Sequence, residues 1–94
     1  MNSVFEALAH PTRRDILEML KSGSKSAGEI ADAFDVSKPT MSGHFAKLKE
    51  AGLIQADQRG TTILYSLNLS TLEEVLLGFM GRIGKDSDGK ETEQ

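Results

Sequence analysis

The sequence predicts a mainly helical domain in which the only strands form one β-hairpin before the last helix. Apolar residues recur at intervals of three and four positions through the first half of the chain and again after residue 70, which is typical of amphipathic helices. Between these stretches apolar and polar residues alternate, as they do in half-buried strands. The expected order is four helices, two strands and a fifth helix, within one domain covering residues 1–84.

The composition limits the chemistry open to the chain. It has 94 residues and no cysteine, which excludes disulfides, thiolate metal sites and cysteine nucleophiles. No apolar run is long enough to cross a membrane, and the first residues lack the pattern of a signal peptide. We therefore expect a small cytoplasmic domain, of a size at which dimerisation adds useful buried surface.

Two helices are expected before the first glycine. Asn2–Ala9 has apolar residues at helical spacing but is too short to be stable alone, so it must pack on another element. Pro11 is expected to open a helix that ends near Lys21. Arg13 and Arg14 fall in its first turn, where the helix dipole disfavours cations. Either a neighbouring carboxylate compensates for them, or they bind a group outside this helix.

Glu29–Ile54 predicts a short helix, a tight turn and a longer helix. Ser26 is expected to cap the first helix in a capping box, and Ser37 to cap the second. Pro39 suits the first turn of the second helix, and Gly52 suits the position just after its end. The buried stripe of the second helix is expected to be Met41, Phe45 and Leu48.

The opposite side of this second helix carries small, hydrogen-bonding and cationic side chains, as a helix that reads the major groove requires. Lys38 is expected to reach guanine acceptors or a phosphate, and Ser37 and Thr40 to contact phosphates. His44 is expected to donate to a base or phosphate, unless it is tucked against the first helix of the motif. The expected DNA contacts here are Ser37, Lys38, Pro39, Thr40, Ser42, Gly43, His44 and Lys47.

The period changes from helical to alternating after Gly52. Residues 53–57 and 61–67 predict two strands, and Gln58–Gly60 predicts the hairpin tip, with glycine supplying a positive φ angle. Arg59 is expected to lie in a minor groove beside the reading helix, and a solvated turn residue is the alternative. Thr61 is expected to contact DNA beside it.

The net charge of −3 argues weakly against nucleic-acid binding, but the charges are unevenly distributed. Ser37–Arg59 contains four basic and two acidic residues, whereas the first helix of the motif and the chain end are acidic. Phosphate binding responds to the local field, so the net sign decides little. Lys47 is either a phosphate contact or a solvated charge.

The last helix is expected to run over Thr71–Ile83 with Ser70 as its cap, followed by a disordered polar tail at residues 85–94. Its apolar stripe and that of the first helix exceed what one small monomer can hide, so we expect a two-fold dimer. The alternative is that both helices fold back on one core. The expected interface residues are Val4, Phe5, Leu8, Leu72, Val75, Leu76, Phe79, Met80 and Ile83.

Four motifs together resemble the ArsR family of bacterial winged helix-turn-helix repressors over Val4–Ile83. They are PTRR at the start of the second helix, S-x-P-T-x-S-x-H in the reading helix, L-x-x-A-G-L-I before the hairpin and Y-S-L at its end. The resemblance implies a homodimer joined through its first and last helices. It also implies binding to an imperfect inverted repeat in double-stranded DNA and a block of transcription.

The chain departs from this family at the metal-binding positions. Ser26 and Gly28 stand where metal-sensing members carry a C-x-C pair, and the last helix has no histidine. The resemblance therefore implies no metal and no cofactor. It is nearer to the branch that represses its own operon, often beside a membrane partner that releases it. Gly43 replaces a long side chain, so a base contact is lost unless the helix approaches the groove more closely.

We therefore expect a homodimeric repressor that occludes a promoter. The alternatives are a protein-interaction module and a sensor whose inducer is a small non-metal molecule between the terminal helices. An enzyme is not expected, because His10 and His44 lie on separate elements and no glycine-rich phosphate loop or carboxylate pair is present. We expect a structural role for His10.

Overall fold

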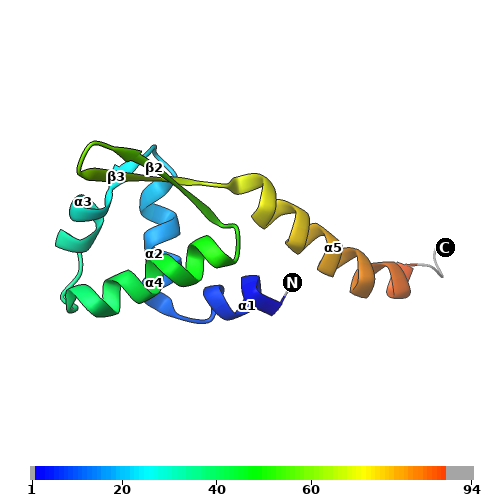
Figure 1. The fold of residues 1–94 in the computed structure, drawn as a ribbon. Coiled ribbons are helices and arrows are strands. Elements are labelled where there is room, and N and C mark those ends of the chain that lie inside the picture. Colours follow the sequence, from blue (N-terminus) through cyan, green and yellow to red (C-terminus); the bar gives the residue numbers. More distant parts are fainter. Residues whose placement is uncertain (1, 89–94) are drawn as a thin grey trace.

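Five helices and a three-stranded sheet make up the computed structural model, which describes residues 2–88 (Figure 1). The four helices before the hairpin lie together under the sheet, and the fifth leads away from them. The elements are α1 (Asn2–Leu8), α2 (Pro11–Leu20), β1 (Lys25–Ser26), α3 (Ala27–Asp32), α4 (Lys38–Glu50), β2 (Ile54–Arg59), β3 (Thr62–Leu67) and α5 (Leu69–Asp88).

The core lies where α1, α2, α3 and α4 meet the base of the hairpin. Its largest fully buried side chains come from three helices, α2, α3 and α4, and from the loop after α4. They are Ile16, Ile30, Met41, Leu48 and Leu53. The predicted stripe of α4 is confirmed. The stripe also includes Phe45, whose ring centre lies 4.5 Å from that of Tyr65 in β3. This contact fixes α4 against the sheet.

The predicted ends of the two helices of the helix-turn-helix, at Ser26, Ser37 and Gly52, are confirmed. The Ser26 hydroxyl accepts from the Glu29 N–H at 3.0 Å while the Glu29 carboxylate accepts from the Ser26 N–H at 2.8 Å, which completes the capping box. Ser37 caps α4 and accepts from the Thr40 N–H. After α4, Gly52 has φ +75° and donates to Lys49, the arrangement of a Schellman motif.

The sheet has one strand more than predicted. β1 pairs antiparallel with β3, with Lys25 opposite Tyr65 and Ser26 opposite Leu64, so the strand order is β1-β3-β2. Two residues are too few to show an alternating pattern. The hairpin tip is also displaced from its predicted place, because Arg59 pairs with Thr62 and leaves a two-residue loop in which Gly60 has φ +63°.

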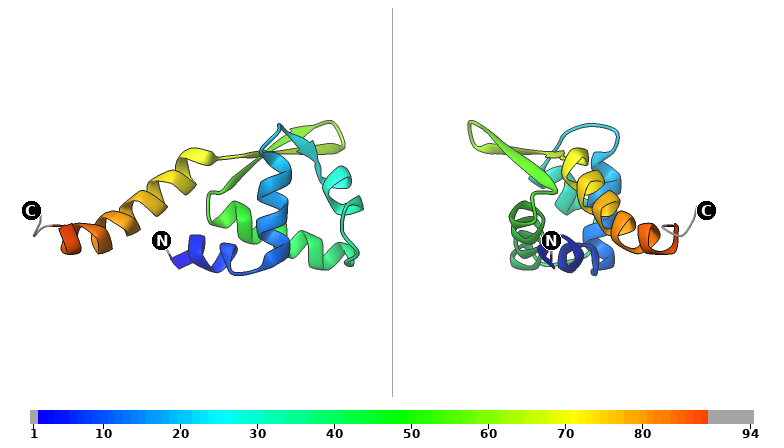
Figure 2. Two further views of the ribbon diagram at one scale, coloured as in Figure 1. Left: turned by 180° about the vertical axis from the view of Figure 1, so that it is seen from behind. Right: turned by 90° about the vertical axis from the view of Figure 1, so that its right-hand side faces the viewer.

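The last helix is longer than predicted at both ends. It begins at Leu69, so Ser70 lies inside the first turn and is not the cap. It continues to Asp88, so residues 85–88 of the predicted disordered tail are helical, and residues 89–94 lie outside the described part. Figure 2 shows that α5 projects from the other helices, consistent with overall dimensions of 56 × 23 × 20 Å.

We predict that Gly52→Ala lowers the free energy of unfolding by about 1–2 kcal/mol, the cost of a left-handed backbone at a residue with a Cβ atom. An added Cβ would meet only Thr71 at 3.6 Å, an ordinary contact, so the backbone alone is responsible. Gly28→Ala, inside helix α3 with open space around its Cβ position, is the control and should stabilise slightly. Urea unfolding of both variants measures the difference, and equal effects would contradict this explanation.

Candidate nucleic-acid interface

Helix α4 exposes one side from its first residue to its last. Around the helix, its exposed arc is centred on three residues with short or compact side chains, Pro39, Gly43 and Ala46, and on Glu50 in the last turn. Lys38 and Ser42 lie along one edge of this arc. Thr40 and Lys47 lie along the other edge, also exposed. A backbone flanked by hydrogen-bonding and cationic groups can approach a base-pair edge closely, and Ala46 is a member of this face that the motif did not reveal.

The hydroxyls at the start of α4 form a pair. The Ser37 hydroxyl donates to the Thr40 hydroxyl at 2.9 Å and accepts from the Thr40 N–H at 3.3 Å. Both side chains are exposed. Their remaining hydrogen-bonding capacity points away from the core at the N-terminus of a helix, where the dipole favours an anion such as a phosphate.

The predicted place of His44 on the exposed face is wrong. Its side chain is only 6% exposed, because position 44 falls between Met41 and Leu48 on the buried arc of α4. The alternative partner, the first helix of the motif, is also wrong. His44 instead contacts the start of α2, with its ring centre 4.5 Å from that of His10 and its Nδ1 3.2 Å from an Arg13 nitrogen.

Arg13 joins three helices. Its guanidinium donates to the carbonyls of Ala7 at 2.8 Å and Glu6 at 2.9 Å, in addition to its contact with His44. Arg14 donates to the Leu8 carbonyl at 2.7 Å. These carbonyls belong to the last turn of α1, where the helix dipole favours a cation. Both arginines therefore bind a group outside their own helix, and no neighbouring carboxylate is needed to compensate for them.

In each of the two histidines the ring Nδ1 accepts a hydrogen bond. Arg13 can only donate, so the Nδ1 of His44 accepts. The Nδ1 of His10 accepts from the Thr12 N–H at 3.1 Å and so caps α2, which confirms its structural role. Burial lowers the pKa of His44, and the neighbouring His10 and Arg13 lower it further. Although the fold brings both rings together, each has a structural hydrogen bond.

The hairpin carries an exposed ion pair beside its tip. Arg59 lies in β2, and its guanidinium contacts the Asp57 carboxylate at 2.8 Å, which raises the pKa of Arg59. Both side chains are more than half exposed, so the pair contributes little to stability and a phosphate can compete for the arginine. Thr61 is exposed in the adjoining turn.

Some of the expected dimer-interface residues pack against the core of their own chain, and others are exposed. The prediction that Val4 lies in the dimer interface is wrong, because Val4 is 3% exposed and lies in the core of its own chain. Leu8, Leu72 and Val75 are half-buried against that core, and Phe5 meets Phe79 edge-on at 5.4 Å. The exposed large apolar side chains of α5 are Leu69, Leu76, Leu77, Phe79, Met80 and Ile83.

Two further searches cover only the described residues. Within residues 2–88, no three side chains of histidine, cysteine, aspartate or glutamate gather closely enough to hold a metal ion. Among the helices of that same part of the chain, none combines the length and hydropathy needed to span a bilayer.

The helix-turn-helix, its exposed second helix and the adjoining hairpin define a winged helix-turn-helix protein. A family model described as a helix-turn-helix domain matches residues 8–55. Transcriptional repressor SdpR of Bacillus subtilis is 44% identical over 94% of this chain and 99% of its own length. HTH-type transcriptional repressor SmtB of Mycobacterium tuberculosis is 31% identical over 89% of this chain and 62% of its own length.

Solved structures agree with these sequence relatives. The crystal structure of an ArsR family transcriptional regulator superposes with a TM-score of 0.83 at 27% identity, over 92% of this chain and 94% of that one. An ArsR-like transcriptional regulator from Rhodococcus sp. RHA1 gives 0.80 at 30% identity, over 95% and 83%. The chain belongs to the ArsR family of winged helix-turn-helix transcriptional repressors.

We predict that acid destabilises the protein through His44. Its folded-state pKa lies below the ordinary value of 6.5, so the unfolded chain binds the extra proton more readily. The contribution of the neutral His44 to the free energy of unfolding should be fully present above about pH 6.5. It should be lost as the pH drops through and below that value. Urea unfolding at pH 7.5 and pH 5.5 measures the loss.

His44→Gln is the matched variant, because a glutamine oxygen can still accept from Arg13 but does not titrate. Its stability should depend less on pH than that of the wild type. An identical pH dependence in the two proteins would show that another group is responsible.

Proposed function

We propose that the protein represses transcription as a homodimer bound to an inverted-repeat operator that overlaps a promoter. The observation that carries this proposal is the exposed arc of α4, with small residues at its centre and hydrogen-bonding or cationic residues along both edges. Occupied DNA excludes polymerase, so binding alone is sufficient for repression. The protein acts where promoter DNA lies, in the cytoplasm, and no catalytic step is needed.

The centre of the arc supports an unusually close approach to the groove. Gly43 has no heavy atom within 4 Å of the position that a Cβ would take, so nothing in the folded chain requires a glycine there. Glycine in a helix interior destabilises it by about 0.5–1 kcal/mol relative to alanine. A residue that costs stability without a packing reason is best explained by what it leaves free for DNA.

The exposed side of α5 supports dimerisation. Leu76, Phe79 and Met80 present apolar surface, and Phe79 continues onto α1 through its contact with Phe5. A two-fold axis along this stripe buries each copy against the other and fixes the separation of the two reading helices. An inverted repeat then matches the symmetry of the dimer.

Regulation without metal fits the residues at the start of α3. The Ser26 hydroxyl is occupied by the capping box, and Gly28 has no side chain to offer. The high identity to transcriptional repressor SdpR over almost the whole of both chains supports repression. Autorepression of the protein's own operon, with release by a membrane protein encoded beside it, is the form of regulation that the sequence resemblance implies.

We predict that Gly43→Leu weakens operator binding by roughly tenfold or more, since losing even one good base contact costs about 1–3 kcal/mol. The free protein should be at least as stable as the wild type, because the site is open. Gel shifts with DNA from upstream of the protein's own gene, at several salt concentrations, measure the affinity. Wild-type affinity should itself fall steeply with salt.

Gly78→Leu is the control, because Gly78 is also an exposed helical glycine with open space but lies on α5. It should leave the affinity unchanged. Loss of affinity in both variants, or in neither, would contradict the proposed reading face. Absence of any DNA complex in the wild type would favour a protein-interaction module.

We predict that Leu76→Glu converts the dimer to a monomer, because a carboxylate on the apolar stripe would be buried without a partner. Leu77→Glu is the matched control. Leu77 is 66% exposed against 36% for Leu76, but it points about 100° away around the helix. Analytical ultracentrifugation distinguishes the two, and a monomeric Leu77→Glu beside a dimeric Leu76→Glu would overturn the assigned face.

A further inference from the structure

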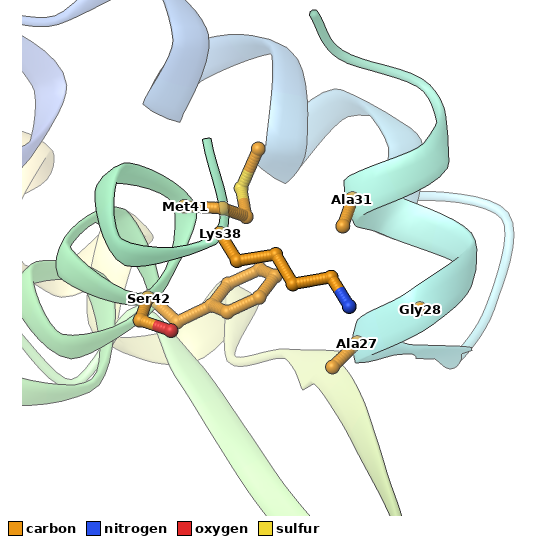
Figure 3. A pocket seen from close by; sticks show the side chains of 7 residues that line it. Ala27, Gly28, Ala31, Lys38, Met41 and Ser42 are labelled. Carbon is orange, nitrogen blue, oxygen red and sulfur yellow. The ribbon is translucent and has the colours of Figure 1, made fainter. Parts of the chain in front are cut away.

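A cavity of about 250 Å³ lies between α3 and the first half of α4 (Figure 3). Drug-sized ligands occupy pockets of about 300–1,000 Å³, so this one suits a smaller molecule. Its apolar walls are formed by two alanines and a glycine of α3 and by a methionine and a phenylalanine of α4. The lining residues are Ala27, Gly28, Ala31, Lys38, Met41, Ser42 and Phe45.

One cation lies over these apolar walls. Figure 3 shows the Lys38 side chain extending from α4 toward α3, with its nitrogen nearest the side of the cavity formed by Ala27 and Ala31. Among the side chains that the structure describes, those of residues 3–84, no carboxylate forms an ion pair with Lys38. The Glu29 carboxylate of α3 is held by the Ser26 N–H. The Ser42 hydroxyl is the other polar group of the lining.

We infer that this cavity binds a small amphiphilic carboxylate, with its apolar chain between α3 and α4 and its carboxylate on the Lys38 ammonium. The Ser42 hydroxyl can donate a second hydrogen bond to the same group. The lining has no histidine, thiol or carboxylate to ligate a metal. A single cation over an apolar cavity matches one negative charge on an apolar body.

The effect of this ligand on DNA binding rests on the proposed function. Lys38 and Ser42 form one edge of the exposed arc of α4 that is proposed to face DNA. A bound carboxylate occupies both side chains and adds negative charge beside the phosphates. Such a ligand therefore competes with the operator and acts as an inducer. Its site lies inside the reading motif, apart from the terminal helices.

Octanoate is the probe, and octanamide is its uncharged control of equal length. In ¹H–¹⁵N NMR titrations of the free protein, octanoate should shift the amides of Ala27, Gly28, Ala31 and Met41 saturably. Octanamide should bind at least about fivefold more weakly, because it lacks the charge-assisted contact. Unshifted cavity amides, or equal binding of the two compounds, would overturn the site.

Gly28 lines the cavity, and a Cβ there meets only the Ser26 hydroxyl oxygen at 4.0 Å, so Gly28→Leu adds a side chain at the cavity without displacing the backbone. It should abolish octanoate binding, as should Ala31→Leu, a second filling variant. Lys38→Met should lower octanoate affinity, whereas Lys47→Met, on the other edge of α4, should not. Octanoate binding that survives both filling variants would place the ligand elsewhere.

Operator release is measured separately, by gel shift. Octanoate should dissociate the wild-type complex but not that of Gly28→Leu, which keeps Lys38 and Ser42 free for DNA. Octanoate bound in the cavity while the operator stays bound would overturn the competition. A protein that binds no operator would overturn the proposed function, while the NMR titrations would still decide whether the cavity binds a carboxylate.

Discussion

The Arg13 guanidinium is the contact on which the arrangement of helices α1, α2 and α4 depends. It lies in the first turn of α2, donates to the final carbonyls of α1 and donates to the buried ring of His44 in α4. Helix α1 has only seven residues, too few to be stable alone. One side chain thus fixes the position of α1, which contacts α5, relative to α4, which carries the exposed arc.

Most helices and both hairpin strands could be predicted because each has a periodic pattern, and the caps because each uses a side chain a few residues from its target. His44 was misplaced because its residue type suits a DNA contact. The spacing from Met41 and Leu48 would have placed it on the buried arc. The partners of Arg13 and Arg14 could not be predicted, since those carbonyls belong to another helix and backbone acceptors leave no trace in the sequence.

The dimer prediction was limited in a similar way. Apolar spacing identifies which side of a helix is buried but not whether it is buried in its own chain or in a partner. Val4 and Phe79 have equivalent patterns, yet Val4 lies in the core and Phe79 is exposed on α5. The cavity between α3 and α4 was also beyond prediction, because it results from small residues on one helix facing a methionine and a phenylalanine on another.

The short strand β1 gives the two ends of the hairpin different tolerance to change. Lys25 and Ser26 pair with Tyr65 and Leu64, and Ser26 is also the cap of α3, so a deletion there would disturb the start of that helix. The distal turn after Arg59 has no such link. Insertions at that turn would lengthen the ribbon outward while α3 and α4 keep their geometry. The length of the ribbon, and with it the proposed contact to the duplex, can therefore diverge between descendants of this protein independently of base preference.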